Sequence, residues 1–102
     1  MDGGFIMIPY SHADEKNTIL AYAELFKDKT IQKIIEKDSI QSNEEAIHLA
    51  NFFWDMARES NKLDKEKNTN SEFILEKVIN TLMAYYRASG YEQQWVEVAE
   101  KQ

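Results

Sequence analysis

The chain has 102 residues, of which 43% are hydrophobic and 12% aromatic, and it contains no cysteine. This length suits one domain with a modest core, and the lack of cysteine excludes disulfide frameworks, thiolate zinc sites and cysteine nucleophiles. The formal net charge of −6 argues against nucleic acid as the main ligand, because affinity for nucleic acid comes mostly from neutralising phosphates.

The first ten residues, MDGGFIMIPY, are predicted to form an extended lead-in. Gly3 and Gly4 disfavour a helix, and Pro9 biases Ile8 away from the helical region. No apolar run of the chain is longer than five residues, and the run here, residues 5–8, is far shorter than the about 20 residues of a membrane span. It is also too short for a signal peptide, so a cytoplasmic protein without a membrane partner is expected.

A helix is predicted to begin at Ser11, because Ser11 and Asp14 have the spacing of a capping box. Apolar residues then recur at helical spacing: Ile19, Tyr22, Ala23 and Phe26. A straight continuation would place Lys27 and Thr30 inside this apolar stripe. The pattern therefore predicts a break near residues 27–30, followed by a short helix that Asp28 caps and that carries Ile31, Ile34 and Ile35.

The strongest local signal is Ser42-Asn43-Glu44-Glu45, which has the S-x-x-E spacing of a full capping box. It predicts a helix that runs to about Ser60. The apolar side chains of this helix cover an arc of roughly 220°, about twice the arc that packing on one side requires. The helix is therefore predicted either to be central in the bundle or to be partly covered by another chain.

Residues 61–70, NKLDKEKNTN, form the most polar stretch and are predicted to be a loop. The next helix is expected to be capped by Asn70 or Ser71 and to end at Gly90. A short amphipathic helix with Tyr91, Trp95, Val98 and Ala99 then ends the chain. The predicted fold class is all-α: a small three- to five-helix bundle with an extended N-terminal lead-in, in one domain over residues 1–102.

The pair Glu45-x-x-His48 matches the spacing that carboxylate-bridged metal proteins place on a bundle helix. Such a site needs a second copy of the motif, and His12, the other histidine, is not preceded by Glu at this spacing. His48 projects away from the apolar side of its helix, so we expect a solvated histidine near acids. Ser11, His12 and Asp14 also contain the residue types of a catalytic triad. A helix cap explains Ser11 and Asp14 better, because they are neighbours at a predicted helix start. No metal, cofactor or enzymatic activity is predicted.

Residues 31–50 also have the layout of a helix-turn-helix or ribbon-helix-helix unit. The second helix begins with Glu44 and Glu45, however, where a DNA-reading helix needs Arg, Lys, Asn or Gln. Arg58 and Arg87 are the only arginines of the chain. Nucleic acid is therefore not the predicted partner.

The run Phe52-Phe53-Trp54 suggests a contact with another protein. Consecutive helical residues point about 100° apart, so one core is not expected to bury all three. The ring left over is a candidate surface anchor, since aromatic residues are enriched at interfaces. The flank with Trp54 and Ile47 is favoured. The predicted protein-binding residues are Ile47, Trp54, Phe52, Tyr91 and Trp95.

The function predicted from these patterns is that of a non-enzymatic helical binding module, whose partner is another protein or a second copy. A small acidic inhibitor, an immunity or anti-host factor, or a regulatory adaptor would act in this way. The Lys-, Asn-, Ile- and Glu-rich composition is typical of an AT-rich bacterial genome or its phage. The alternative is a dimeric DNA-associated transcriptional regulator. The third interpretation is a small metal- or carboxylate-dependent enzyme, carried by His48, Glu44, Glu45 and Asp55.

Overall fold

The computed structural model describes residues 12–67 and 71–102. They form five helices: α1 (His12–Leu25), α2 (Lys29–Lys37), α3 (Asn43–Lys67), α4 (Ser71–Ser89) and α5 (Glu92–Glu100). Within these ranges the fold is a small all-α bundle without strands, which confirms the predicted fold class. The expected lead-in and the predicted cap at Ser11 lie outside the described residues. None of the five helices is long and apolar enough to cross a membrane.

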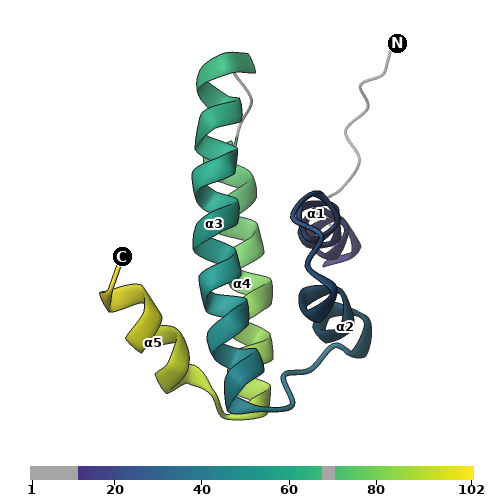
Figure 1. Cartoon of the computed structure of the whole chain (residues 1–102), viewed down its shortest axis with the longest axis vertical. Coiled ribbons are helices and arrows are strands. Elements are labelled where there is room, and N and C mark those ends of the chain that lie inside the picture. Colours follow the sequence, from purple (N-terminus) through teal and green to yellow (C-terminus); the bar gives the residue numbers. More distant parts are fainter. Residues whose placement is uncertain (1–11, 68–70) are drawn as a thin grey trace.

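The antiparallel pair of α3 and α4 forms the long axis of the bundle (Figure 1). The two N-terminal helices, α1 and α2, lie on one side of this pair, and α5 lies on the other side. α1 packs against α2 and α4, whereas α5 packs mainly against α3 and to a smaller extent against α4. α3 therefore has a neighbour on each flank in addition to α4 behind it.

The predicted break between α1 and α2 is present, and backbone hydrogen bonds explain it. The N–H of Asp28 donates to the carbonyl of Ala23 at 2.7 Å, and the N–H of Lys27 donates to the carbonyl of Glu24 at 3.1 Å. This pair of bonds is a Schellman motif, which ends a helix. The carboxylate of Asp28 then caps α2, because its Oδ1 accepts the N–H of Ile31 at 3.1 Å. α2 can thus turn its apolar residues into the core: Ile31, Ile34 and Ile35.

The start of α3 confirms the predicted capping box, but its end corrects the prediction. The N–H of Glu45 donates to Ser42 Oγ at 3.1 Å, and Glu45 Oε1 accepts the N–H of Gln41, one residue before the cap, at 2.9 Å. The helix continues beyond Ser60 to Lys67, into the predicted loop over residues 61–70. Residues 61–67 contain no Gly or Pro, and five of the seven are Lys, Leu or Glu, which favour helix, so polarity alone does not end it.

The wide apolar arc of α3 is covered by other helices of the same chain. Phe52 packs against Phe26, which directly follows α1, with ring centroids 5.8 Å apart. On the other flank, Phe53 and Trp54 pack against Trp95 of α5, at 5.4 Å and 6.2 Å. Phe52 and Phe53 are each 3% exposed, and Trp54 is partly buried. α3 is therefore the central helix, with other helices on two opposite flanks. As the 100° spacing predicts, the core does not bury all three rings: Phe52 and Phe53 are buried, and Trp54 remains partly exposed.

Two consecutive tyrosines connect α4 to the other helices. Tyr86 is fully buried, and its hydroxyl donates to the carbonyl of Ala46 on α3. The hydroxyl of Tyr85 donates to Asp38 Oδ1, directly after α2, at 2.7 Å. Asp38 also pairs with Lys16 of α1, at 2.8 Å. Burial raises the pKa of both tyrosines, and the Asp38 carboxylate raises the pKa of Tyr85 further.

The ends of α1 and α4 share a left-handed backbone conformation, but a lysine occupies one end and a glycine the other. α4 ends at Gly90, as predicted, where the N–H groups of Gly90 and Tyr91 both donate to the carbonyl of Tyr86. Gly90 has a left-handed φ of 77°, and a Cβ built there would meet no atom within 4 Å. Lys27 has the same left-handed backbone, with φ of 58°, at the end of α1. A side chain in this conformation is strained, whereas glycine adopts it readily.

We expect Lys27→Gly to raise the free energy of unfolding by about 0.5–1 kcal/mol and Gly90→Ala to lower it by about 1 kcal/mol. The open space around Gly90 means that the loss comes from backbone conformation alone. Urea denaturation followed by circular dichroism measures both changes. A loss of stability in Lys27→Gly would show that contacts of the lysine side chain outweigh the backbone strain.

Candidate protein-binding surface

The five predicted protein-binding residues lie on α3, on α5 and at the residue before α5. Ile47 on α3 is 38% exposed, and Phe52 is 3% exposed. The remaining three, Trp54, Tyr91 and Trp95, are partly buried and pack against the core. The structure thus brings Trp54 and Trp95 together, leaves Ile47 open to solvent and places Phe52 in the core.

An aromatic cluster joins α5 to α3 and α4, and we call it the α3–α5 seam: Phe53, Trp54, Tyr86 and Trp95. The ring of Trp95 lies 5.4 Å from Phe53 and 5.5 Å from Tyr86, and it stacks on Trp54 at 6.2 Å with an interplanar angle of 25°. The indole Nε1 of Trp54 is buried and has no hydrogen-bond partner among the described residues. A buried donor without an acceptor costs about 1–3 kcal/mol, which offsets part of the stabilisation that the packed rings contribute.

On the opposite flank of α3, a groove of about 460 Å³ lies between α3 and the turn that joins α1 to α2. We call it the α3 groove. Its apolar part consists of Phe26 and Phe52, which meet edge to face. The remaining lining residues are charged: Asp28, Asp55, Arg58, Glu59 and Lys62. An apolar centre with a charged rim is the usual composition of a protein–protein contact.

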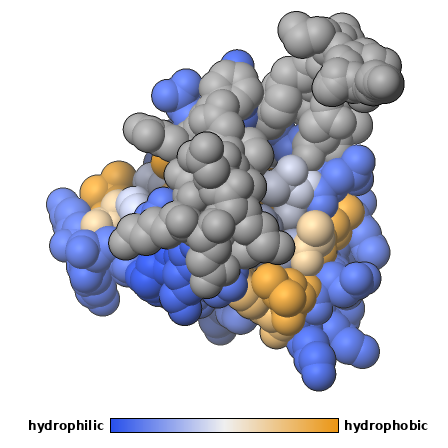
Figure 2. Space-filling model, turned by 90° about the horizontal axis from the view of Figure 1, so that it is seen from above, coloured by the Kyte–Doolittle hydropathy of each residue, from blue (hydrophilic) through white to orange (hydrophobic). Residues whose placement is uncertain are grey.

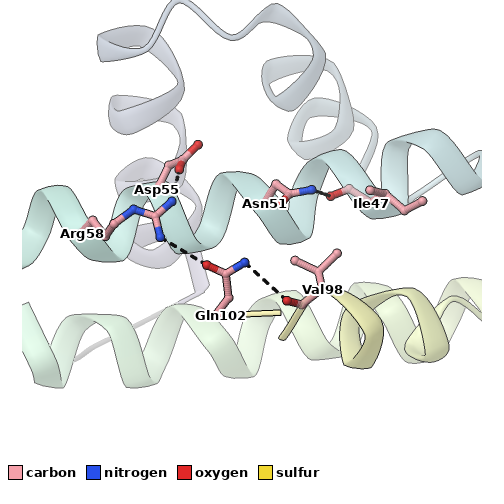
Figure 3. Close-up of polar contacts among 6 residues, drawn as sticks. All are labelled: Ile47, Asn51, Asp55, Arg58, Val98 and Gln102. Carbon is pink, nitrogen blue, oxygen red and sulfur yellow. Dashed lines mark hydrogen bonds and ion pairs between the residues drawn. The ribbon is translucent and has the colours of Figure 1, made fainter. Parts of the chain in front are cut away.

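The outward side of α3 connects the groove to α5. Figure 3 shows Ile47, Asn51, Asp55 and Arg58 following one another along this helix. The side-chain amide of Asn51 donates to the carbonyl of Ile47 at 3.0 Å. Arg58 contacts the carboxylate of Asp55 and donates to Gln102 Oε1 at 3.2 Å. These pairs are exposed, so they orient the side chains on this surface but add little stability.

His48 has a partner that the sequence did not indicate. Its Nε2 lies 2.7 Å from Oδ2 of Asp28, which is 20 residues earlier and caps α2. The histidine side chain remains 45% exposed. Glu45, the other member of the Glu-x-x-His pair, binds the N–H of Gln41 at the start of its own helix. Among the described residues, no group of three or more His, Asp or Glu side chains is placed to hold a metal ion.

The structure also reveals exposed apolar side chains that the sequence pattern did not single out. Leu25, at the end of α1, is 60% exposed, and Val96 of α5 is 43% exposed. Figure 2 shows a largely hydrophilic surface, with small hydrophobic areas on the side of α1 and on the side of α5. Leu25 is close in sequence to the apolar Tyr22 and Phe26. Its exposure depends on how α1 packs against α2 and α4, and the spacing of apolar residues does not reveal this packing.

The four side chains that would carry an enzymatic activity lie on α3. Of His48, Glu44, Glu45 and Asp55, only Asp55 lines the α3 groove. Comparisons of the chain with protein-family models, curated proteins and solved structures find no match. A functional proposal for this chain therefore rests on the geometry of α3 and its two flanks.

Proposed function

We propose that this chain is a non-enzymatic, cytoplasmic helical binding protein that acts by occupying the surface of a partner protein. The contact surface is the outward side of α3, from the exposed Ile47 to the α3 groove. The observation that carries the proposal is the composition of the groove, in which the partly exposed Phe26, packed on the buried Phe52, lies inside a rim of charged side chains. A small acidic inhibitor, an immunity or anti-host factor, or a regulatory adaptor would bind in this way.

Apolar side chains supply part of the binding free energy of such a contact. Each large apolar side chain withdrawn from water contributes about 1.5–3 kcal/mol. Ile47, Phe26 and one matching side chain of the partner therefore contribute about 4.5–9 kcal/mol before the entropy of association is deducted, so a micromolar complex also needs the charged contacts of the groove rim. The contact does not need a deep cavity.

Charge indicates the kind of partner. The rim of the groove contains acidic and basic side chains, but the carboxylate of Asp28 already pairs with His48 and that of Asp55 already contacts Arg58. The chain as a whole has a net charge of −6. Long-range attraction therefore favours a partner whose binding surface is basic around an apolar side chain, and association with it should slow as salt is added.

The test compares Ile47→Glu with Val96→Glu. Both residues are β-branched, lie on helices and are similarly exposed, at 38% and 43%, but Val96 lies on α5. A tagged chain is used to capture partners from the native host, and the captured protein is then purified and titrated against each variant. We expect Ile47→Glu to weaken binding by about tenfold or more, because one charge is buried against an apolar surface, and Val96→Glu to bind like the wild type.

Circular dichroism checks that both variants keep the helical content of the wild type. Equal losses in the two variants, or no loss in Ile47→Glu, would place the contact elsewhere. A wild-type chain that is monomeric and captures nothing would also reject the proposed function.

A further inference from the structure

The outward side of α2 carries three lysines in one row, and we call this row the lysine stripe: Lys29, Lys33 and Lys37. They recur every four residues of the helix and therefore lie one above the other on the same side. All three are exposed, on the side opposite to the isoleucines that α2 buries in the core. With a rise of about 1.5 Å per residue, the stripe is about 12 Å long.

The acidic side chains near the stripe do not neutralise it. Asp28 and Asp38 each have a partner elsewhere in the protein. Glu36 lies on the side of α2 that faces α1, where it lines a hollow between the two helices. Among the described residues, no carboxylate forms an ion pair with a lysine of the stripe, and Lys37 donates only to the side-chain oxygen of Gln41. Three lysines against one glutamate leave the exposed side of α2 with a net charge of +2.

This positive side is unusual for the chain, which has a net charge of −6. α5 lies on the other side of the α3–α4 pair, where it exposes Glu92, Glu97 and Glu100 (Figure 1). Charges separated by more than about 10 Å are largely screened at an ionic strength of about 0.1 M. An anionic group that approaches α2 is therefore attracted by the lysine stripe more than it is repelled by the acidic residues on the far side.

We infer that the lysine stripe of α2 binds an acidic segment of a partner protein. Each lysine is a compact charge on a flexible stem, so it pairs with a carboxylate without requiring one fixed geometry. A segment with three or more Asp or Glu side chains therefore complements the stripe. Nucleic acid fits less well, because modules that bind it contact about 6–10 phosphates and read bases mostly through arginine, which α2 lacks.

The lysine stripe is separate from the contact surface of the proposed function. None of its three lysines lines the α3 groove. The stripe also favours a partner of the opposite charge, since the net charge of the chain favours a basic surface at the groove. Exposed ion pairs contribute little each, so the stripe by itself gives a weak contact that salt weakens further.

The experiment follows the backbone amides of the isotope-labelled full-length chain by NMR while hexaglutamate is added to millimolar concentration at an ionic strength of about 0.1 M. We expect the largest chemical-shift changes in α2. Lys33→Glu should weaken binding of hexaglutamate about threefold or more, because one attraction is replaced by a repulsion. Lys101→Glu is the matched control: it changes the net charge equally but lies after α5, so its effect should stay below about twofold.

Circular dichroism checks that both variants keep the helical content of the wild type, and Lys33→Gln should give a smaller loss in the same direction. The inference is wrong if hexaglutamate leaves the amides of α2 unchanged. Equal losses in Lys33→Glu and Lys101→Glu would also overturn it, because binding would then follow net charge alone. Tighter binding of hexathymidylate than of hexaglutamate at α2 would identify nucleic acid as the partner instead. Ile47→Glu should not change the binding of hexaglutamate, so the two proposals can fail separately.

Discussion

Replacing Phe52 with alanine is expected to lower the free energy of unfolding by about 3–5 kcal/mol. Phe52 is 3% exposed and meets Phe26 edge to face, so its ring holds the segment that joins α1 to α2 against α3. Truncation removes this contact and leaves a cavity that the helices fill only in part. Urea denaturation monitored by circular dichroism measures the loss.

Ile47→Ala on the same helix is the control for Phe52→Ala. Ile47 is 38% exposed, and truncation there should cost less than about 1 kcal/mol. Trp54→Ala should fall between the two, because its ring is partly buried and its truncation also removes a donor without an acceptor. A cost of less than about 1 kcal/mol for Phe52→Ala would mean that the segment joining α1 to α2 is not packed against α3.

Alkaline pH is expected to destabilise the protein steeply, through Tyr85 and Tyr86. Burial raises the pKa of both tyrosines in the folded state, whereas unfolded tyrosines ionise near pH 10. Above about pH 10 the unfolded chain therefore binds fewer protons than the folded one, and the free energy of unfolding decreases. The stabilisation is fully present below about pH 10 and is lost as the pH rises toward the raised pKa values. Each tyrosine should contribute a slope of about 1.4 kcal/mol per pH unit.

Urea denaturation at about pH 8 and about pH 11 tests this dependence. Tyr85→Phe and Tyr86→Phe should each remove about half of the slope that the two tyrosines contribute, and each should cost about 1–2 kcal/mol at neutral pH because a hydrogen bond is lost. Asp38→Asn is the matched control: its carboxylate contributes to the raised pKa of Tyr85, so the substitution should reduce the contribution of Tyr85 and leave that of Tyr86 unchanged. An unchanged slope in Tyr86→Phe would contradict the assignment.

The ends of several helices could be predicted because the signals are local. Asp28 caps α2, Ser42 caps α3 and Gly90 ends α4, and in each case the bonded partners lie within five residues of one another. The end of α3 at Lys67 was not predicted correctly from local signals. The polar composition of residues 61–70 predicts a loop, whereas α3 continues to Lys67 because the sequence up to there contains no helix-breaking residue.

The contacts that define the candidate surfaces could not be predicted, since they join distant parts of the chain. His48 pairs with Asp28 across 20 residues, and Tyr85 binds Asp38 across 47. The sequence places Trp95 on the apolar side of a short amphipathic helix, but it does not indicate that this ring stacks on Trp54. The entropic cost of closing a chain segment rises only slowly with its length. This cost is therefore similar for many pairs of distant residues, and it does not select which of them come into contact.

The apolar arc of α3 separates what the sequence determined from what only the tertiary structure decided. The residues between Ser42 and Ser60 show that a surface on more than one side of this helix must leave water. They do not show what covers it, because the hydrophobic effect depends on the area withdrawn from water and has no direction. The same pattern would be satisfied by any of several covers: α1 and α2, α4, a second copy of the chain or a partner protein. In the tertiary structure the chain's own helices cover this surface, and α5 covers the flank of Trp54.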